Sequence, residues 1–127
     1  MTRRVLITGL GPVSGLGLGI EPTWAGALEG RSAIGRIDLF NPDGFPCRIA
    51  AQLRDFSVRD FVPKSYRKAT KVMASDIELA VAAAMLAARD AGLRTAGTDP
   101  DGAGKPDFAP SYEPGRVGCH VGAGLIA

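Results

Sequence analysis

Residues 71–92 read KVMASDIELAVAAAMLAARDAG, and this stretch decides the fold. Residues 79–88 carry no polar side chain, and Ala, Leu and Met are strong helix formers. Ser75 and Asp76 suit the N-terminal turn, and Gly92 suits a left-handed C-cap. The pattern predicts a helix that is apolar on all sides at its centre and is therefore buried within protein. The apolar stretch is shorter than the roughly 20 residues that span a membrane, so no membrane insertion is expected.

The bulk properties describe a globular chain of 127 residues with one domain at most. Hydrophobic residues make up 46% and charged residues 22%, which excludes a disordered chain. The formal net charge of +2 is too small to indicate a nucleic-acid partner. Cys47 and Cys119 lie far apart and outside any metal-binding spacing, so we expect no metal and a reducing cytoplasm.

Segments with strand character flank the helix. Val5, Leu6 and Ile7 form a continuous β-prone run, which is typical of a strand covered on both faces. Residues 116–124 are expected to form a second strand that runs into a glycine turn. Strand, helix and strand predict a right-handed parallel βαβ unit, and therefore an α/β fold. Residues 94–115 lack periodicity and predict an exposed excursion.

The glycine-rich segment 9–19 follows the first expected strand and invites comparison with a dinucleotide-binding loop. Ser14 stands where the third glycine of that fingerprint belongs, and Pro12 removes an amide that a phosphate would use. We expect a tight loop that needs positive φ angles, and keep a nucleotide-binding module as an alternative. Residues 21–29 predict a short helix that ends at Gly30, with Trp24 as a packing anchor.

Residues 41–44 read NPDG and predict a turn before an edge strand within 46–53. Cys47, at the start of that segment, is expected to be a small buried hydrophobe. Cys119 and His120 are neighbours, but successive residues of a strand point to opposite faces, so we expect no catalytic dyad and a structural role for His120. The chain closes on an apolar run after a glycine turn, and we expect it to be a fragment.

The most basic segment of the chain precedes the helix. Lys64, Arg67, Lys68 and Lys71 follow the spacing i, i+3, i+4, i+7, so that in a helix all four cations would share one face. One interpretation is a solvated face of the protein. The other is a docking surface for an acidic partner or a phosphate group.

Several motifs in the same order resemble the β-ketoacyl-acyl-carrier-protein synthases of the elongating type. They cover nearly the whole chain and about the first third of a typical family member. The opening strand and loop, the helix end and the second strand with its glycine turn all carry the resemblance. The matching segments are residues 4–14, Trp24, 30–37, Phe40, 44–46, 48–50, 87–93, 116–118 and 122–124.

The resemblance implies a thiolase-like layered fold, of which residues 1–127 supply the first βαβ unit and its insertions. It implies decarboxylative Claisen condensation in fatty-acid or polyketide synthesis, with a catalytic cysteine and two histidines that lie beyond this chain. Neither Cys47 nor Cys119 has the Ala-Cys context of the nucleophile, and His120 does not match the histidines. We therefore expect no catalytic residue, cofactor or metal site in the chain.

The resemblance also implies partners. The family has a basic segment before this helix that touches the acidic acyl carrier protein, which favours carrier docking by Lys64, Arg67, Lys68 and Lys71. A homodimer or a ketosynthase-like heterodimer is implied, without a nucleic-acid partner. The alternative within the family is a non-catalytic subunit that resembles a chain-length factor.

Overall fold

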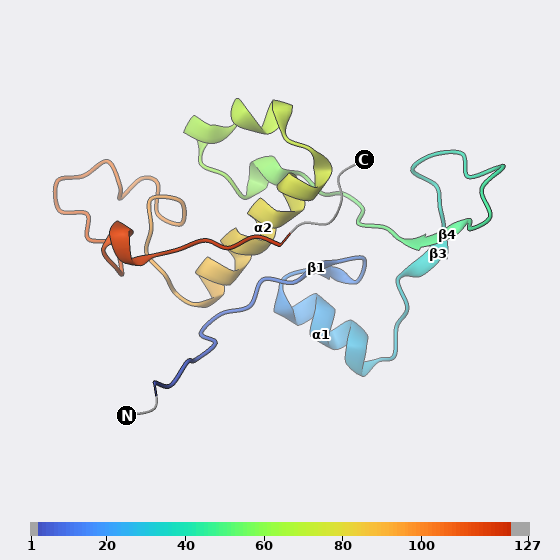
Figure 1. Cartoon of the computed structure of the whole chain (residues 1–127), viewed down its shortest axis with the longest axis horizontal. Helices are drawn as coiled ribbons and strands as arrows, with labels where there is room; N and C mark the ends of the chain where they lie inside the picture. Colours follow the sequence, from blue (N-terminus) through green and yellow to red (C-terminus); the bar gives the residue numbers. More distant parts are fainter. Residues whose placement is uncertain (1–2, 123–127) are drawn as a thin grey trace. The chain divides into compact units, whose positions relative to one another are not determined.

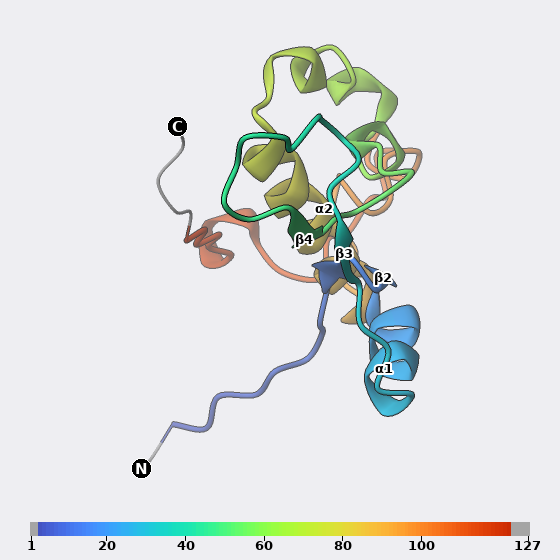
Figure 2. The same ribbon diagram turned by 90° about the vertical axis from the view of Figure 1, so that its right-hand side faces the viewer.

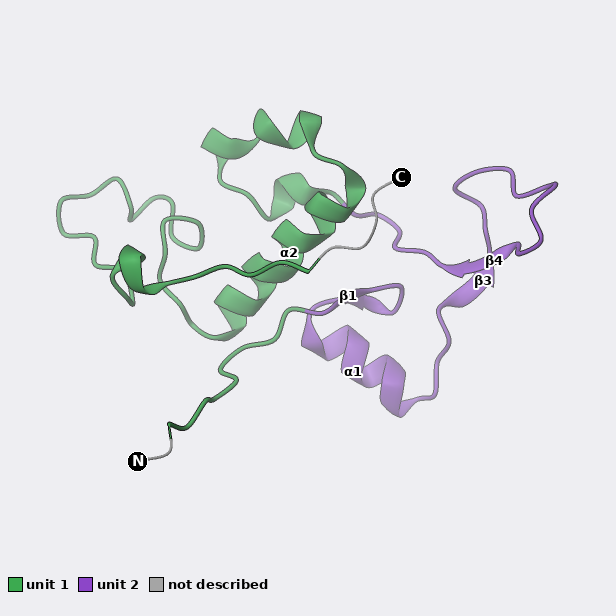
Figure 3. Ribbon diagram, viewed as in Figure 1, with its two compact units in different colours: residues 1–11, 57–127 green, residues 12–56 purple. Residues whose placement is uncertain are grey.

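The structure is a computed structural model that describes residues 3–122. It contains two compact units (Figures 1 and 3). The first unit holds the described residues up to Gly11 and from Ser57 onward, and the second runs from Pro12 to Phe56. The first unit contains the long helix and the basic segment, and so it contains the candidate site.

The long helix of the first unit, α2, spans Ser75–Asp90 and confirms the central prediction. Gly92 has φ +64°, and the N–H groups of Gly92 and Leu93 donate to the carbonyls of Arg89 and Ala88, which gives the expected left-handed helix end. The N-cap is Ala74 and makes no side-chain cap hydrogen bond, so the expected capping by Ser75 is wrong. The first-turn carboxylates instead act through the helix dipole.

The core of this unit lies where the 3-10 turn η1 (Val58–Asp60) packs against α2. Figures 1 and 2 show the chain after η1 folding over the N-terminal half of the helix. Ala82 is fully buried, and Val58 and Phe61 are buried beside it. Ile77 remains 44% exposed. The residues that the structure describes therefore cover α2 on one side only, whereas the sequence predicted a helix buried on all sides.

The predicted strand at residues 5–7 is wrong for this structure. Val5, Leu6 and Ile7 have no regular secondary structure and are 92%, 79% and 83% exposed. A strand exists only when a neighbouring strand accepts and donates its backbone hydrogen bonds. None of the described residues supplies such a partner here.

The second predicted strand also differs from the structure. Its start lies in the 3-10 turn η4 (Pro114–Arg116), and residues 117–122 continue without strand pairing. The expected glycine turn falls partly outside the described residues. Neither residues 5–7 nor residues 117–122 pair with another strand within residues 3–122, which explains why neither forms a strand. Of the predicted βαβ unit, these residues contain only the helix.

The second unit contains two small antiparallel sheets and one helix. Strands β1 (Val13–Ser14) and β2 (Gly17–Leu18) form a hairpin, and α1 (Ile20–Leu28) follows. Strands β3 (Ile34–Arg36) and β4 (Ile49–Ala51) pair in the second sheet, which confirms the strand expected within 46–53.

Backbone angles in the second unit confirm the expected tight loop. Gly17 and Gly19 have φ of +146° and +90°, and Gly30, with φ +63°, follows the end of α1. Trp24 is 63% exposed, so its expected role as a packing anchor is wrong for this structure. The residue that α1 buries is Gly26, which lies against Leu16.

The predicted turn at residues 41–44 is confirmed as well. Gly44 has φ +90°, and the Asn41 side chain accepts the N–H of Asp43 at 3.1 Å. Cys47 is exposed, and its thiol donates to the Ile49 carbonyl at 3.3 Å, so the expected buried position is wrong. Most residues of the nearby β3 and β4 are themselves exposed, so this short sheet does not bury the thiol.

Candidate functional site

The basic segment consists of two 3-10 turns, η2 (Lys64–Tyr66) and η3 (Ala69–Val72). The segment is not an α-helix, so the condition under which all four cations would share one face is not met. Arg67 N–H donates to the Lys64 carbonyl, and Lys71 N–H donates to the Lys68 carbonyl. Because side chains at i and i+3 eclipse in a 3-10 helix, the cations fall into two pairs, Lys64 with Arg67 and Lys68 with Lys71.

Buried Thr70 links the second turn to the residue that ends the first. Its hydroxyl donates to the Arg67 carbonyl at 2.9 Å, and its side chain is 5% exposed. The four cations are exposed, and among residues 3–122 none of them has a carboxylate within ion-pair distance. Exposed Tyr66 and Val72 lie in the same segment. We call residues 64–72 the basic segment; it combines unneutralised cations with an aromatic and an aliphatic side chain.

One cation pair borders a hollow of about 410 Å³. Lys64, Ser65 and Arg67 line it, together with the neighbouring residues Val62 and Pro63. Residues from the excursion, Pro100 and Asp101, also line it. Lys68 and Lys71 lie outside the hollow, so the structure separates the four predicted residues into an inner and an outer pair.

The excursion that carries Asp101 is held by its own hydrogen bonds. At its base, Arg94 N–H donates to the Ser111 hydroxyl at 2.8 Å, and Ser111 N–H donates back to the Arg94 carbonyl. Asp99 accepts from Arg94 Nε at 2.9 Å and from Gly102 N–H at 2.9 Å. These two hydrogen bonds, the Arg94 bond foremost, lower the pKa of Asp99 below its usual value. Residues 94–113 form no helix or strand and are mostly exposed, as predicted, and these hydrogen bonds order the part of the excursion around Asp101.

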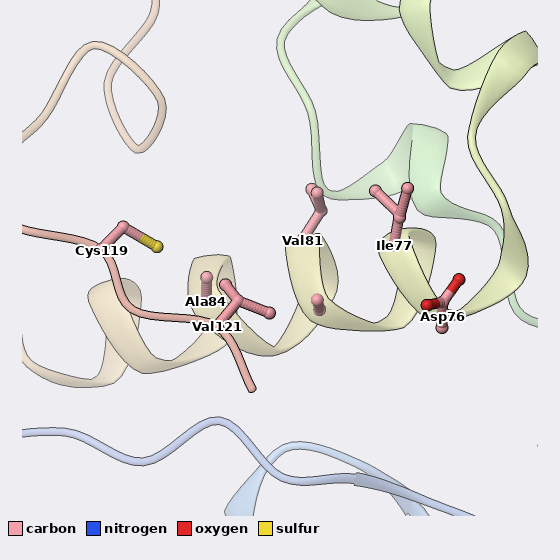
Figure 4. Close-up of a pocket in the computed structure, with 7 residues that line it drawn as sticks. Asp76, Ile77, Val81, Ala84, Cys119 and Val121 are labelled. Carbon is pink, nitrogen blue, oxygen red and sulfur yellow. The ribbon is translucent and has the colours of Figure 1, made fainter. Parts of the chain in front are cut away.

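A second, apolar hollow of about 300 Å³ lies on the exposed side of α2 (Figure 4). Cys119 and Val121 line it from the segment that crosses the helix, whereas His120 does not line it. The thiol and the imidazole therefore do not share this hollow. The lining from α2 comprises Asp76, Ile77, Ala80, Val81 and Ala84.

The glycines of the first loop pack against α2. A Cβ on Gly9 would overlap the Ala87 carbonyl, and a Cβ on Gly11 would overlap that of Ala83. The Leu10 N–H donates to the Asp90 carboxylate at 2.9 Å. These glycines permit a close approach of the loop to the helix. A phosphate at this loop would meet the negative charge of Asp90, which argues against the nucleotide-binding alternative.

Within residues 3–122, no group of three or more His, Cys, Asp or Glu side chains is arranged to hold a metal ion. No helix among these residues is both long and apolar enough to cross a bilayer.

Sequence reasoning did not find Asp101. It lies in a stretch without periodicity, 30 residues or more from Lys64 and Arg67, and no local pattern indicates that these three residues line one hollow. A single sequence carries no signal for such a contact.

The observed features define a mixed α/β chain with an alanine-rich central helix and a basic approach to it. Residues 2–124 match the family model described as "Beta-ketoacyl synthase, N-terminal domain". The chain therefore belongs to the β-ketoacyl synthase family, as the sequence motifs had indicated, and corresponds to the thiolase-like N-terminal domain of that family.

Known proteins with similar sequences support the same family assignment. The 3-oxoacyl-[acyl-carrier-protein] synthase 2 of Coxiella burnetii is 38% identical over 126 residues, which cover 97% of this chain and 26% of the relative. The synthase of the same name from Vibrio harveyi is 32% identical over 123 residues, with the same coverage. The chain thus spans about a quarter of the length of these relatives.

A solved structure described as "The ishigamide ketosynthase/chain length factor" is also similar. It is 36% identical and superposes with a TM-score of 0.61 over 72% of this chain and 22% of the other. A shorter match, 41% identical over 59 residues, is the "Actinorhodin polyketide putative beta-ketoacyl synthase 2" of Streptomyces coelicolor.

Proposed function

We propose that this chain is the N-terminal part of a β-ketoacyl-acyl-carrier-protein synthase, and that its own role is to bind the acyl carrier protein. The complete protein would join an acyl thioester to malonyl-carrier protein by decarboxylative Claisen condensation. The observation that carries the docking role is the basic segment, in which Lys64, Arg67, Lys68 and Lys71 are exposed and lack ion pairs to the described residues.

Unpaired cations favour an acidic partner for two reasons. Their charges are not cancelled within the unit, so they raise the rate of encounter with a negative surface. Tyr66 and Val72, exposed among them, add apolar contact area of the kind that interfaces use. A solvated face, the other interpretation of the sequence, needs neither of these exposed side chains.

The two segments expected as strands support the proposal of a larger layered fold. Val5, Leu6 and Ile7 expose a continuous β-prone run, and residues 117–122 cross α2 without a ladder partner. The open apolar hollow on α2 is a surface that further protein would cover. In the complete protein these segments would form parallel strands on either side of the α2 crossover.

The proposal assigns no catalytic residue to this chain. Cys47 and Cys119 are exposed, and the described side chains that line the hollow around Cys119 include the Asp76 carboxylate and no histidine or lysine. Unpaired exposed thiols suit a reducing cytoplasm. The complete protein is proposed to work without a cofactor, as a homodimer.

One alternative within the same fold is a non-catalytic subunit that pairs with a ketosynthase. The similar structure described as a ketosynthase/chain length factor favours it. Reading the coding sequence downstream of residue 127 separates the two. An Ala-Cys turn in a small-residue context identifies a synthase, and its replacement by residues without a thiol identifies the non-catalytic subunit.

The docking role is tested by measuring the affinity of the chain for an acidic acyl carrier protein at low salt. Reversal of the outer pair, Lys68→Glu with Lys71→Glu, is expected to weaken binding about ten-fold or more. The matched control is Arg3→Glu with Arg4→Glu, which changes the net charge equally at another exposed segment. If the two double variants weaken binding equally, the effect is due to net charge alone, and the basic segment is not a specific docking surface.

A further inference from the structure

The hollow beside η2 is lined by opposite charges that form no ion pair with each other. Lys64 and Arg67 line it together with Asp101. Within residues 3–122 the Asp101 carboxylate makes no hydrogen bond and no ion pair of 4 Å or less. A negative charge therefore shares the hollow with two cations and remains available to any group that enters.

Asp101 is also held in place. The residue before it follows Asp99, whose carboxylate accepts from Arg94 and from Gly102 N–H at 2.9 Å each. Ala103 N–H donates to the Asp99 carbonyl at 3.0 Å, which closes the turn around Asp101. Gly102, the next residue, is buried. Because the turn is held by hydrogen bonds, Asp101 keeps a constant position at the hollow, unlike a charge on a flexible loop.

We infer that Asp101 is a specificity-determining residue that weakens and selects the binding of acidic partners at the inner cation pair, Lys64 and Arg67. This inference rests on the proposed docking function. A partner carboxylate that enters the hollow meets attraction from two cations and repulsion from one carboxylate. Within the basic segment, the outer pair, Lys68 and Lys71, lies outside the hollow that Asp101 lines and attracts a carboxylate without this opposition.

The arrangement defines the kind of partner that fits best. Its carboxylates lie against Lys68 and Lys71, and a neutral or hydrogen-bonding group faces the hollow. A partner with uniform negative charge gains less, because part of its surface is repelled by Asp101. Attenuated binding also suits a carrier that must leave after each reaction, since rapid dissociation follows from modest affinity.

The substitution Asp101→Asn tests the inference, because it removes the charge and keeps the shape. The turn should survive, since its hydrogen bonds use the side chain of Asp99 and backbone groups. The affinity of the 127-residue chain for an acidic acyl carrier protein at low salt is expected to rise about two- to five-fold. Asp107→Asn is the matched control, because Asp107 is an exposed acid of the same excursion that does not line the hollow.

A coupled variant shows whether the effect acts through the hollow. With Lys64→Gln and Arg67→Gln already present, a partner carboxylate is no longer drawn into the hollow. Asp101→Asn should then change the affinity by less than it does in the wild-type chain. An equal gain in both backgrounds would assign the effect to net charge and overturn the inference.

The outcomes distinguish the inference from the proposal beneath it. If the carrier binds and the Lys68 and Lys71 reversal weakens it, while Asp101→Asn leaves the affinity unchanged or lowers it, the docking function stands and the role of Asp101 is wrong. If the wild-type chain does not bind the carrier, the docking function fails and the inference fails with it. If Asp107→Asn strengthens binding as much as Asp101→Asn, the selectivity does not belong to the hollow.

Discussion

The contact between Gly9 and α2 gives a quantitative test of how the first segment is anchored. In Gly9→Ala the new Cβ would lie 2.6 Å from the Ala91 nitrogen and 2.7 Å from the Ala91 Cβ, and would overlap the Ala87 carbonyl. Gly9 does not have a positive φ, so the cost is steric and not conformational. Overpacking of this kind costs about 1–3 kcal/mol.

Two other terms set the net value. Replacing glycine by alanine restricts the unfolded chain and returns about 0.4–1 kcal/mol. If residues 8–10 shift away to relieve the overlap, the bond from Leu10 N–H to the Asp90 carboxylate is lost, which costs about 0.5–1.5 kcal/mol. After subtraction of the alanine term, the unrelieved overlap costs about 0–2.6 kcal/mol, whereas the shifted loop changes stability by less, at most about 1.1 kcal/mol.

Urea unfolding of the 127-residue chain measures this free energy, and the amide exchange rate of Leu10 shows which route is taken. Gly118→Ala is the matched control, because no heavy atom lies within 4 Å of its added Cβ. The control should be neutral or slightly stabilising. A Gly9→Ala chain that is as stable as the control, with Leu10 still protected, would refute the close packing of the loop on α2.

Two further predictions concern chemistry and pH. The 127-residue chain alone should show no condensation of an acyl thioester with malonyl-carrier protein, measured by release of carbon dioxide; release above that of a protein-free control would contradict the assignment of catalysis to residues beyond it. The pKa of Asp99 is lowered, so its contribution to the turn is present at neutral pH and is lost only as the pH falls through that lowered value. The Gly102 amide resonance should therefore titrate with a midpoint below about 3.9, the usual aspartate value, and a midpoint at or above it would contradict the hydrogen bonds from Arg94 and Gly102.

Local signals in the sequence were sufficient for the helices and turns. Helix propensity and Gly92 predicted α2 and its end, and the NPDG motif predicted the turn at Gly44. These elements depend on contacts within a few residues, so their own sequence encodes them.

Strands and surfaces depend on distant residues, and there the predictions were less successful. Val5 to Ile7 has the composition of a strand, but the described residues offer no ladder to complete it. The basic spacing would place four cations on one face of an α-helix, whereas 3-10 turns after Pro63 divide the cations into two pairs. The role of Asp101 follows only from its place beside Lys64 and Arg67, which no local pattern reveals.

The salt dependence of carrier binding tests the central claim most directly. The affinity of the wild-type chain for an acidic acyl carrier protein should fall steeply between about 30 mM and about 300 mM salt, because exposed charges are screened over that range. The chain with Lys68→Glu and Lys71→Glu should bind weakly at low salt and lose the steep dependence, whereas the Arg3 and Arg4 reversal should retain both affinity and slope. An affinity that does not depend on salt, and is the same in all three chains, would contradict a docking surface at residues 64–72.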